Sequence, residues 1–311
     1  MPTSQRSSWL GLYVLLGIVW GSSFLFTKLS LHTWPPFGVV FLRLAIGSLA
    51  LIAVIAWRRL PVTKNWRHWA LMGFGGMFMN TLPFSLFAYA QLNVTSILAS
   101  IINAATPVMT LLALLLFFRS EKLKPNVILG LLIGMVGILI VLAVWQGFGE
   151  NDPIAVLSMI GAITCYGIGG PFIMRYVAPL ELPNEVAALG QVGVAAVATL
   201  PLYLTGPLSI GEVKLESILA IVVLGAVGSG FAYVWYYQII KQVGSAIANS
   251  VTYITPLVAV VFGILLLGES LHWYEPIGAI IVITGAAISQ GRLTRKTFSR
   301  LFGRNKTEAS V

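Results

Sequence analysis

Long apolar runs alternate with short polar breaks along almost the whole chain. Each run is close to the length of about 20 residues that a helix needs to cross the hydrocarbon core of a bilayer. Proline and basic residues occupy the breaks, for example Trp34-Pro35-Pro36 after the first run. The pattern predicts ten transmembrane helices, at about residues 9–30, 37–57, 68–90, 95–118, 126–145, 154–174, 184–204, 216–238, 245–267 and 274–290.

Composition agrees with this pattern and excludes other classes of protein. Of the 311 residues, 58% are hydrophobic and 9% are charged, whereas a soluble domain has about 25% charged residues. A surface so poor in charge excludes a soluble enzyme, a free nucleic-acid-binding protein and a disordered chain. The single cysteine, Cys165, excludes a disulfide framework or a cysteine metal site within one chain. We expect a lipid bilayer and a small molecule as partners, with no nucleic acid, metal or cofactor; the sequence does not specify the oligomeric state, and a monomer is favoured.

The net charge of +9 is concentrated on one side of the predicted helices. If the N-terminus lies inside, 16 of the 19 Lys and Arg residues fall in inner segments or tails, and the outer side holds only Lys214 and Lys28. Basic residues accumulate on the cytoplasmic side of membrane proteins. The distribution therefore predicts that both termini are cytoplasmic and that the number of spans is even. The first apolar run is too long to be the core of a cleavable signal.

The chain contains an internal repeat. Residues 94–123 resemble residues 243–271, and Trp20-Gly21 corresponds weakly to Tyr166-Gly167. Each unit then has five helices, and because five is odd the two copies must enter the bilayer from opposite sides. Inverted repeats are typical of secondary transporters. The expected organisation is a cytoplasmic N-terminus (1–8), two five-helix repeats (9–146 and 153–290) and a basic cytoplasmic tail (291–311). The aligned pairs include Ser96 with Ser245, Thr106-Pro107 with Thr255-Pro256, and Glu121 with Glu269.

Several stretches carry a resemblance to one family. They are IVWGSSFLFTKL, FLRLAIGSLAL, ATPVMTLLALLLFFRSEKL and ITPLVAVVFGILLLGESLHWYEPIGAIIVITG. Over nearly the whole chain the pattern resembles the ten-helix EamA-type transporters of the drug/metabolite transporter superfamily. The resemblance implies an all-α membrane protein with two inverted five-helix repeats around a central cavity. It also implies export of small metabolites, often amino acids, across a bacterial inner membrane; the YddG-type amino-acid exporters are one branch. FFRSEKL departs from the usual leucine-glycine-glutamate, which leaves the role of Glu121 open.

Uncharged polar and aromatic residues are the candidate lining of the cavity. Buried amides and hydroxyls in lipid need partners, and several of these residues occupy equivalent positions in the two repeats or share one helix face. Aromatic walls with a few polar groups suit small amphipathic solutes. The alternative is that these side chains only pack or join helices. The candidates are Trp20, Asn80, Phe84, Asn103, Tyr166, Ser229, Tyr233, Asn249, Thr252 and Tyr253.

Charged groups are scarce inside the predicted helices. None of the ten acidic residues lies near the middle of a span, although such carboxylates are the ordinary relays of proton- or sodium-coupled transport. A downhill facilitator is therefore favoured, with coupling through a less obvious group as the alternative. Arg43 is the basic residue well inside a span, and its repeat equivalent lies near Gly190-Gln191. It has either a functional role or a structural one, with its side chain extended to the outer interface.

Pro107 and Pro256 occupy equivalent positions of the fourth and ninth helices. Proline in a membrane helix frees a backbone carbonyl and permits a kink. The two kinks are either hinges for alternating access or static bends.

The function that these features favour is export of small zwitterionic or neutral metabolites, above all hydrophobic or aromatic amino acids. A phosphorylated substrate would need several Lys or Arg residues, and a strongly cationic drug would favour a buried Glu. A multidrug or neutral-metabolite (nucleobase-like) exporter is the alternative. A membrane-embedded enzyme or a scaffold is disfavoured, because the three histidines lie at span ends in different loops and no catalytic residue is assigned.

Overall fold

The computed structural model describes residues 3–118, 125–143, 145, 152–208 and 210–289, and in this part all regular structure is helical. The first half comprises α1 (Thr3–Leu31), α2 (Pro36–Arg58), α3 (Trp66–Gly76), η1 (Met77–Thr81), α4 (Leu82–Ala90), α5 (Ser96–Asn103), α6 (Thr106–Leu116) and α7 (Pro125–Val141). The second half comprises α8 (Pro153–Phe172), η3 (Ile173–Val177), η4 (Ala178–Leu180), α9 (Asn184–Leu204), α10 (Leu215–Gly225), η5 (Ala226–Phe231), α11 (Ala232–Val243), α12 (Ser245–Asn249), η6 (Ser250–Tyr253), α13 (Thr255–Leu267) and α14 (Tyr274–Ser289).

The predicted all-α membrane architecture is confirmed. Within the described residues, 8 helical segments are long and apolar enough to cross a membrane, and shorter apolar helices cover Leu132–Val141 and Tyr274–Gly285. These two belong to α7 and α14, which correspond to the predicted fifth and tenth spans. Several spans are built from consecutive helical pieces; α3, η1 and α4, for example, form the third span.

Local sequence explains where several helices begin. Pro36 stands at the first turn of α2, where its missing N–H removes no hydrogen bond. The side chains of Asn65, Thr95 and Asp152 accept hydrogen bonds from the free backbone N–H groups that open α3, α5 and α8.

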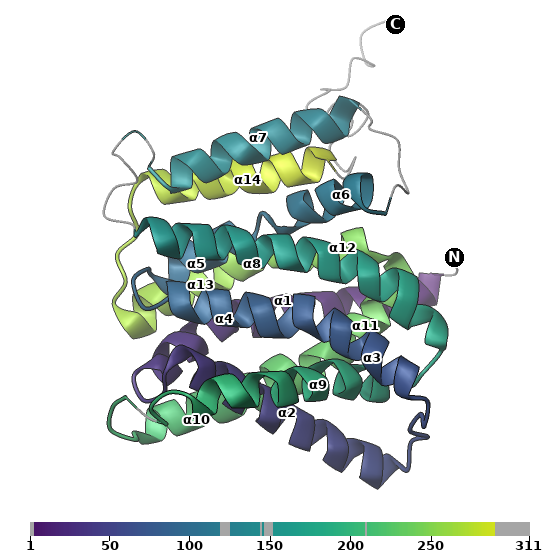
Figure 1. Ribbon diagram of the computed structural model, residues 1–311. Helices are drawn as coiled ribbons and strands as arrows, with labels where there is room; N and C mark the ends of the chain where they lie inside the picture. The colour runs from purple at the N-terminus through teal and green to yellow at the C-terminus, as the bar shows by residue number, and fades with distance from the viewer. Residues whose placement is uncertain (1–2, 119–124, 144, 146–151, 209, 290–311) are drawn as a thin grey trace, which may run out of the picture.

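The helices run roughly parallel to one another, with α7 and α14 side by side at one edge of the bundle (Figure 1). Glycines allow this pair to approach closely: a Cβ placed on Gly137 would lie 2.7 Å from the backbone nitrogen of Val282. Small residues at such contacts are typical of membrane helices. At the opposite edge of the bundle, α2 packs against α9 and α10 (Figure 1).

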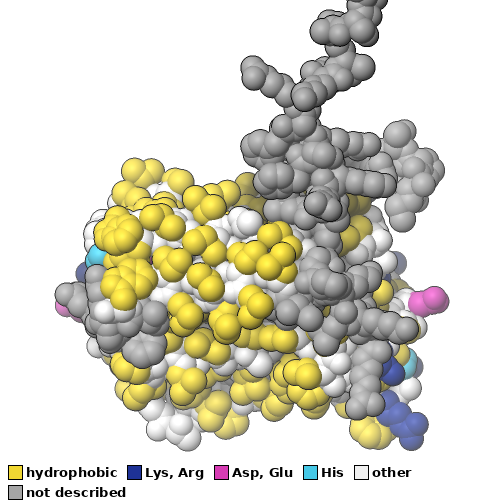
Figure 2. Space-filling view, turned by 90° about the horizontal axis from the view of Figure 1, so that it is seen from above, with side chains coloured by type: hydrophobic (Ala, Val, Ile, Leu, Met, Phe, Trp, Pro, Cys, Tyr) yellow, Lys and Arg dark blue, Asp and Glu magenta, His cyan; other side chains and the backbone are white. Residues whose placement is uncertain are grey.

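The outside of the bundle has the distribution of side chains that a bilayer requires. In the face shown in Figure 2, hydrophobic side chains cover the middle and the charged ones lie at the two ends. Large apolar side chains such as Leu49, Val197 and Leu265 are exposed. Such a broad apolar surface faces lipid in a membrane protein.

Two π-helical segments, η1 and η5, interrupt the third and eighth spans at equivalent positions of the two halves. A glycine precedes each segment, and another helix packs directly against that glycine. A Cβ on Gly76 would collide with the backbone oxygen of Gln191 in α9, and one on Gly225 would lie 2.9 Å from the backbone oxygen of Arg43 in α2. The third span of each half therefore packs closely against the second span of the other half. Single π-helical turns occur frequently at functional sites.

Candidate functional site

A cavity lies between the two halves of the bundle, with about 720 Å³ of empty space that includes its opening. Most of its lining comes from the first half. Thr27, Val39 and Gln91 lie near the end of the bundle where α1 and α4 finish and α2 begins. The cavity therefore extends from the middle of the bundle towards that end, which is the outer side in the predicted orientation.

The structure brings most of the sequence-predicted residues together in the cavity wall. They come from seven different spans, so they meet only when the chain is folded. The wall is mainly aromatic, and its polar groups are amides and hydroxyls apart from one guanidinium. The predicted residues in the wall are Trp20, Arg43, Phe84, Asn103, Tyr166, Tyr233, Asn249 and Thr252.

Three of the predicted residues lie outside the wall. Asn80 and Ser229 are fully buried in the π-helical segments, where they hold side chains of the opposite half. Tyr253 packs instead against the hydrophobic cluster around α5 and α8. Candidate lining chosen from polarity alone therefore included residues that hydrogen-bond to neighbouring helices and do not line the cavity.

Other wall residues were not selected from the sequence. They continue the faces already marked by Trp20 and Phe84 at steps of three or four residues, which is the spacing of one helix face. That periodicity was the available signal; several of these residues are apolar and carried no signal of their own. They include Ser23, Phe24, Thr27, Phe87, Ala88 and Gln91.

Arg43 is held inside the bundle and does not extend to the interface. Its side chain is 6% exposed. The Nε atom donates a hydrogen bond to Ser229 Oγ over 2.9 Å, and the guanidinium carbon lies 3.7 Å from the centre of the Phe84 ring. In the part of the chain that the structure describes, no carboxylate lies within ion-pairing distance of it. The extended conformation considered from the sequence is thus not the one adopted.

The position equivalent to Arg43 in the second half has a different arrangement. Gln191 Nε2 donates to Asn80 Oδ1 over 2.6 Å, and Gln191 Oε1 accepts from Tyr237 OH over 2.9 Å. Gln191 with Asn80 is thus the counterpart of Arg43 with Ser229. The neutral pair lies in a buried hydrogen-bonded network outside the cavity wall, whereas Arg43 itself lies in the wall.

Aromatic rings form a second part of the wall. Trp20 packs at centroid distances of 5.6 Å from Tyr233 and 5.5 Å from Tyr236, and its indole N–H donates to the backbone oxygen of Gly228 in η5. Tyr236 OH donates to Asn249 Oδ1, and Asn249 Nδ2 donates to Thr110 Oγ1. These bonds fix the rings and the amide before any ligand binds.

Pro107 and Pro256 lie where the fourth and ninth spans are broken. Each stands in the first turn of the second helical piece, α6 or α13. Before them, α5 ends at Asn103 and the ninth span passes through the 3-10 segment η6. The breaks place Asn103, Asn249 and Thr252 next to the cavity. The hinge role of the two prolines remains a prediction.

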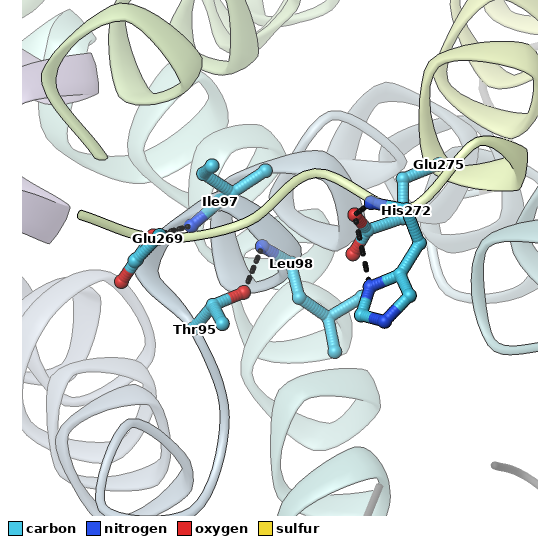
Figure 3. A network of polar contacts seen from close by, with 6 residues as sticks. All are labelled: Thr95, Ile97, Leu98, Glu269, His272 and Glu275. Carbon is cyan, nitrogen blue, oxygen red and sulfur yellow. Dashed lines mark hydrogen bonds and ion pairs between the residues drawn. The ribbon is translucent and has the colours of Figure 1, made fainter. Parts of the chain in front are cut away.

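A carboxylate joins the two halves near the N-terminal end of the fourth span. Glu269 accepts hydrogen bonds from Ser96 N and Ser96 Oγ, both at 2.8 Å, and from Ile97 N at 3.1 Å. Figure 3 shows it pointing at the start of α5, where Thr95 caps Leu98. Gly268, at a φ of 64°, ends α13 and turns the chain toward this contact. The aligned Glu121 lies outside the described residues.

No cluster of three or more His, Cys, Asp or Glu side chains that could hold a metal is present in the described ranges. The chemistry that the wall offers is therefore hydrogen bonding, aromatic contact and a single positive charge.

Comparison with known proteins points in the same direction. The EamA-like transporter family matches residues 7–143 and 153–290, once in each half. The chain is 27% identical over 287 residues to the inner membrane transporter YedA of Escherichia coli K12, covering 91% of this chain and 90% of that protein. It is 23% identical over 302 residues to a probable amino-acid metabolite efflux pump of Salmonella typhimurium LT2, covering 92% and 95%. A crystal structure with 22% identity and a TM-score of 0.67 covers 92% of this chain and 99% of its own, and supports the fold.

Proposed function

The chain belongs to the EamA-like transporter family, and we propose that it exports small zwitterionic or neutral amphipathic metabolites, most of all hydrophobic or aromatic amino acids, across a bacterial inner membrane. The single observation that carries this proposal is the cavity between the halves, with aromatic walls and a few fixed polar groups. A site of this kind binds apolar side chains and uses its polar groups to set their orientation.

Two further observations support transport of an amino acid. The family's relatives bear the names of transporters, and the Salmonella relative is a probable amino-acid metabolite efflux pump. The wall also offers one cation but no carboxylate, a set that suits a solute with a single negative group better than a phosphorylated or strongly cationic one.

Alternating access follows from the repeat. The breaks at Thr106-Pro107 and Thr255-Pro256 lie at equivalent places, and each half presses on the other through Gly76 or Gly225. Inverted repeats let one bundle move against the other around a central site. The cavity here extends to the outer end, so the second state would open the same wall to the cytoplasm.

Orientation is part of the proposal. Arg58, Arg67 and Lys241 all lie near the end of the bundle opposite the cavity's extension. Basic residues favour the cytoplasmic side, which supports cytoplasmic termini and an opening to the outside in this conformation.

The transport is proposed to run downhill, because no Asp or Glu belongs to the cavity wall among the described residues. Purified protein in liposomes should take up labelled L-phenylalanine without an ion gradient, saturably and in competition with excess unlabelled L-leucine. Uptake that appears only with an imposed pH gradient would refute the facilitator part of the proposal. Uptake in neither condition would refute amino-acid transport itself and direct the search to nucleobases and neutral drugs, the alternative that the aromatic walls also accommodate.

A further inference from the structure

One positive charge in the cavity wall has no partner of opposite charge. Arg43 lies well inside the second span, is 6% exposed, and pairs with no carboxylate in the described part of the chain. The titratable side chains that neighbour it are the phenols Tyr166 and Tyr233. A charge inside the membrane is costly and is rarely retained without a counter-charge or a function.

The hydrogen bonds of Arg43 leave its outer donors available. An arginine side chain has five N–H groups, one on Nε and four on the two terminal nitrogens. The Nε group is used by Ser229. The terminal nitrogens make no hydrogen bond to the residues that the structure describes, and the side chain lines the cavity. The N–H groups on the two terminal nitrogens therefore remain, and they can form the two parallel hydrogen bonds with which arginine binds a carboxylate.

The guanidinium is also fixed in place before a ligand arrives. Ser229 holds Nε from the π-helical segment η5, while the ring of Phe84 lies 3.7 Å from the guanidinium carbon. An arginine held on an aromatic face loses less conformational freedom when it binds an anion. The two contacts come from different halves of the chain, so the donor pair is positioned at their interface.

The second half offers no equivalent charge. Gln191, at the matching position, is neutral, and both ends of its amide are engaged by Asn80 and Tyr237. The cavity therefore provides one anion site rather than a symmetric pair. That asymmetry fits a ligand with one negative group and excludes a ligand that needs two.

Aromatic surface lies next to this site. Phe84, Trp20 and Tyr233 share the wall with Arg43, and their rings present apolar faces of the size that an aromatic or branched aliphatic side chain covers. The same faces attract a ligand ammonium group.

We propose that Arg43 is the residue that binds the carboxylate of the transported solute, so that the substrate class is a monocarboxylate with an apolar body, as in an uncharged-side-chain α-amino acid. This assignment rests on the proposed function and names the group of the substrate that the site recognises. Ser229 and Phe84 act as positioning residues for the guanidinium.

The test is equilibrium binding to the purified full-length chain in lipid nanodiscs. Labelled L-phenylalanine is the probe, and unlabelled L-phenylalanine, 3-phenylpropionate and L-phenylalaninamide are competitors. The first two have a carboxylate, and the amide lacks it. We expect the amide to compete about 10- to 100-fold more weakly, the range that loss of a hydrogen bond to a charged group produces.

Three variants decide which residue is responsible. Arg43→Gln should lower affinity for L-phenylalanine about 10- to 100-fold and remove the preference for carboxylates. Arg43→Lys should keep the preference with lower affinity, because lysine is a point charge without the planar pair of donors. Arg175→Gln, which removes an exposed arginine outside the cavity wall, should change neither value. The ratio of competitor affinities is the decisive readout, since a merely structural loss lowers all affinities together.

The possible failures are separable. Equal competition by the amide and the acids in the unmodified chain would overturn the assignment, as would an unchanged preference in Arg43→Gln or no binding of either carboxylate probe. Carboxylate-selective binding that depends on Arg43, without transport in liposomes, would support the site and refute the proposed transport. Transport that shows no carboxylate preference would support the proposed transport and refute the carboxylate site.

Discussion

The contact of Glu269 with the start of α5 gives a sharp prediction, because one carboxylate there joins the two halves of the molecule. The substitution is Glu269→Gln, which preserves the size of the side chain and removes its charge. The carboxylate accepts from two backbone N–H groups and one hydroxyl. The backbone N–H groups open a helix, so the charge also lies at the positive end of the dipole of α5.

The expected loss follows from these contacts. A hydrogen bond to a charged group contributes about 1.5–3 kcal/mol and a neutral one about 0.5–1.5 kcal/mol. A charge at a helix N-terminus adds about 0.3–1 kcal/mol. Glutamine retains one acceptor oxygen and places its NH2 group against at least one of the three donors. We therefore expect the substitution to destabilise the folded chain by about 1–3 kcal/mol.

Thermal unfolding in a fixed detergent measures this loss, followed by the fluorescence of a reagent that labels Cys165 faster once unfolding makes its partly buried thiol fully accessible. At about 2–4 °C per kcal/mol for a chain of this size class, the melting temperature should fall by several degrees. Glu212→Gln removes an exposed glutamate in a loop and should change nothing. Ser96→Ala should give a smaller loss, and the double variant should lose less than the sum, since both residues serve one contact.

A melting temperature unchanged within about 1 °C of the parent protein would refute the reasoning. So would strict additivity of Ser96→Ala and Glu269→Gln, because two residues that bond directly must show a coupling energy.

Three further predictions follow from the structure. Gln191→Leu leaves the buried Tyr237 hydroxyl and the Asn80 amide without their partner, so the free energy of unfolding should fall by about 1–3 kcal/mol in denaturant titration. Gln146→Leu, outside the described residues, serves only as an expression control. A loss below about 0.5 kcal/mol for Gln191→Leu would contradict the network. Gly225→Val places a branched side chain against Ile46 and the backbone of Arg43 and should abolish folding or reduce the yield severely. Gly206→Val, where nothing lies within 4 Å, should not. Equal yields of the two variants would show that α10 does not approach α2 closely at Gly225. Pro256→Ala restores a backbone N–H in the first turn of α13 and should reduce the rate of L-phenylalanine uptake more than its binding affinity if the break moves; an unchanged rate would identify the break as a static bend.

How much of the fold the sequence predicted depends on the range of the interactions. Apolar runs of membrane length and the distribution of Lys and Arg are local or additive signals, and they located the ten helices. The Thr-Pro pairs and the weak repeat indicated the inverted architecture, which the family match supports. The π-helical segments η1 and η5 had no such signal, because a π-turn depends on the helix packed against it, here through Gly76 and Gly225.

The candidate site was predicted less completely. Trp20, Tyr166 and Tyr233 were selected because aromatic residues recur at matched positions, and all three lie in the cavity wall. Asn80 and Ser229 have the same polarity as wall residues, yet their partners are Gln191 and Arg43 from the opposite half. Which polar atom meets a ligand and which meets another helix is decided by contacts between residues more than 100 positions apart, and helix periodicity alone does not contain that information.

The most direct measurement of the central claim, that solute passes through the cavity between the halves, is counterflow of labelled L-phenylalanine in liposomes with a single reporter cysteine. In a Cys165→Ala background, Ser23→Cys places the thiol in the cavity wall, while Ser100→Cys places it at a fully buried position outside the wall. The account predicts that a membrane-impermeant thiol reagent stops counterflow only for Ser23→Cys, and that excess L-phenylalanine slows the modification. Full modification of Ser23→Cys with undiminished counterflow would show that the solute does not use this cavity.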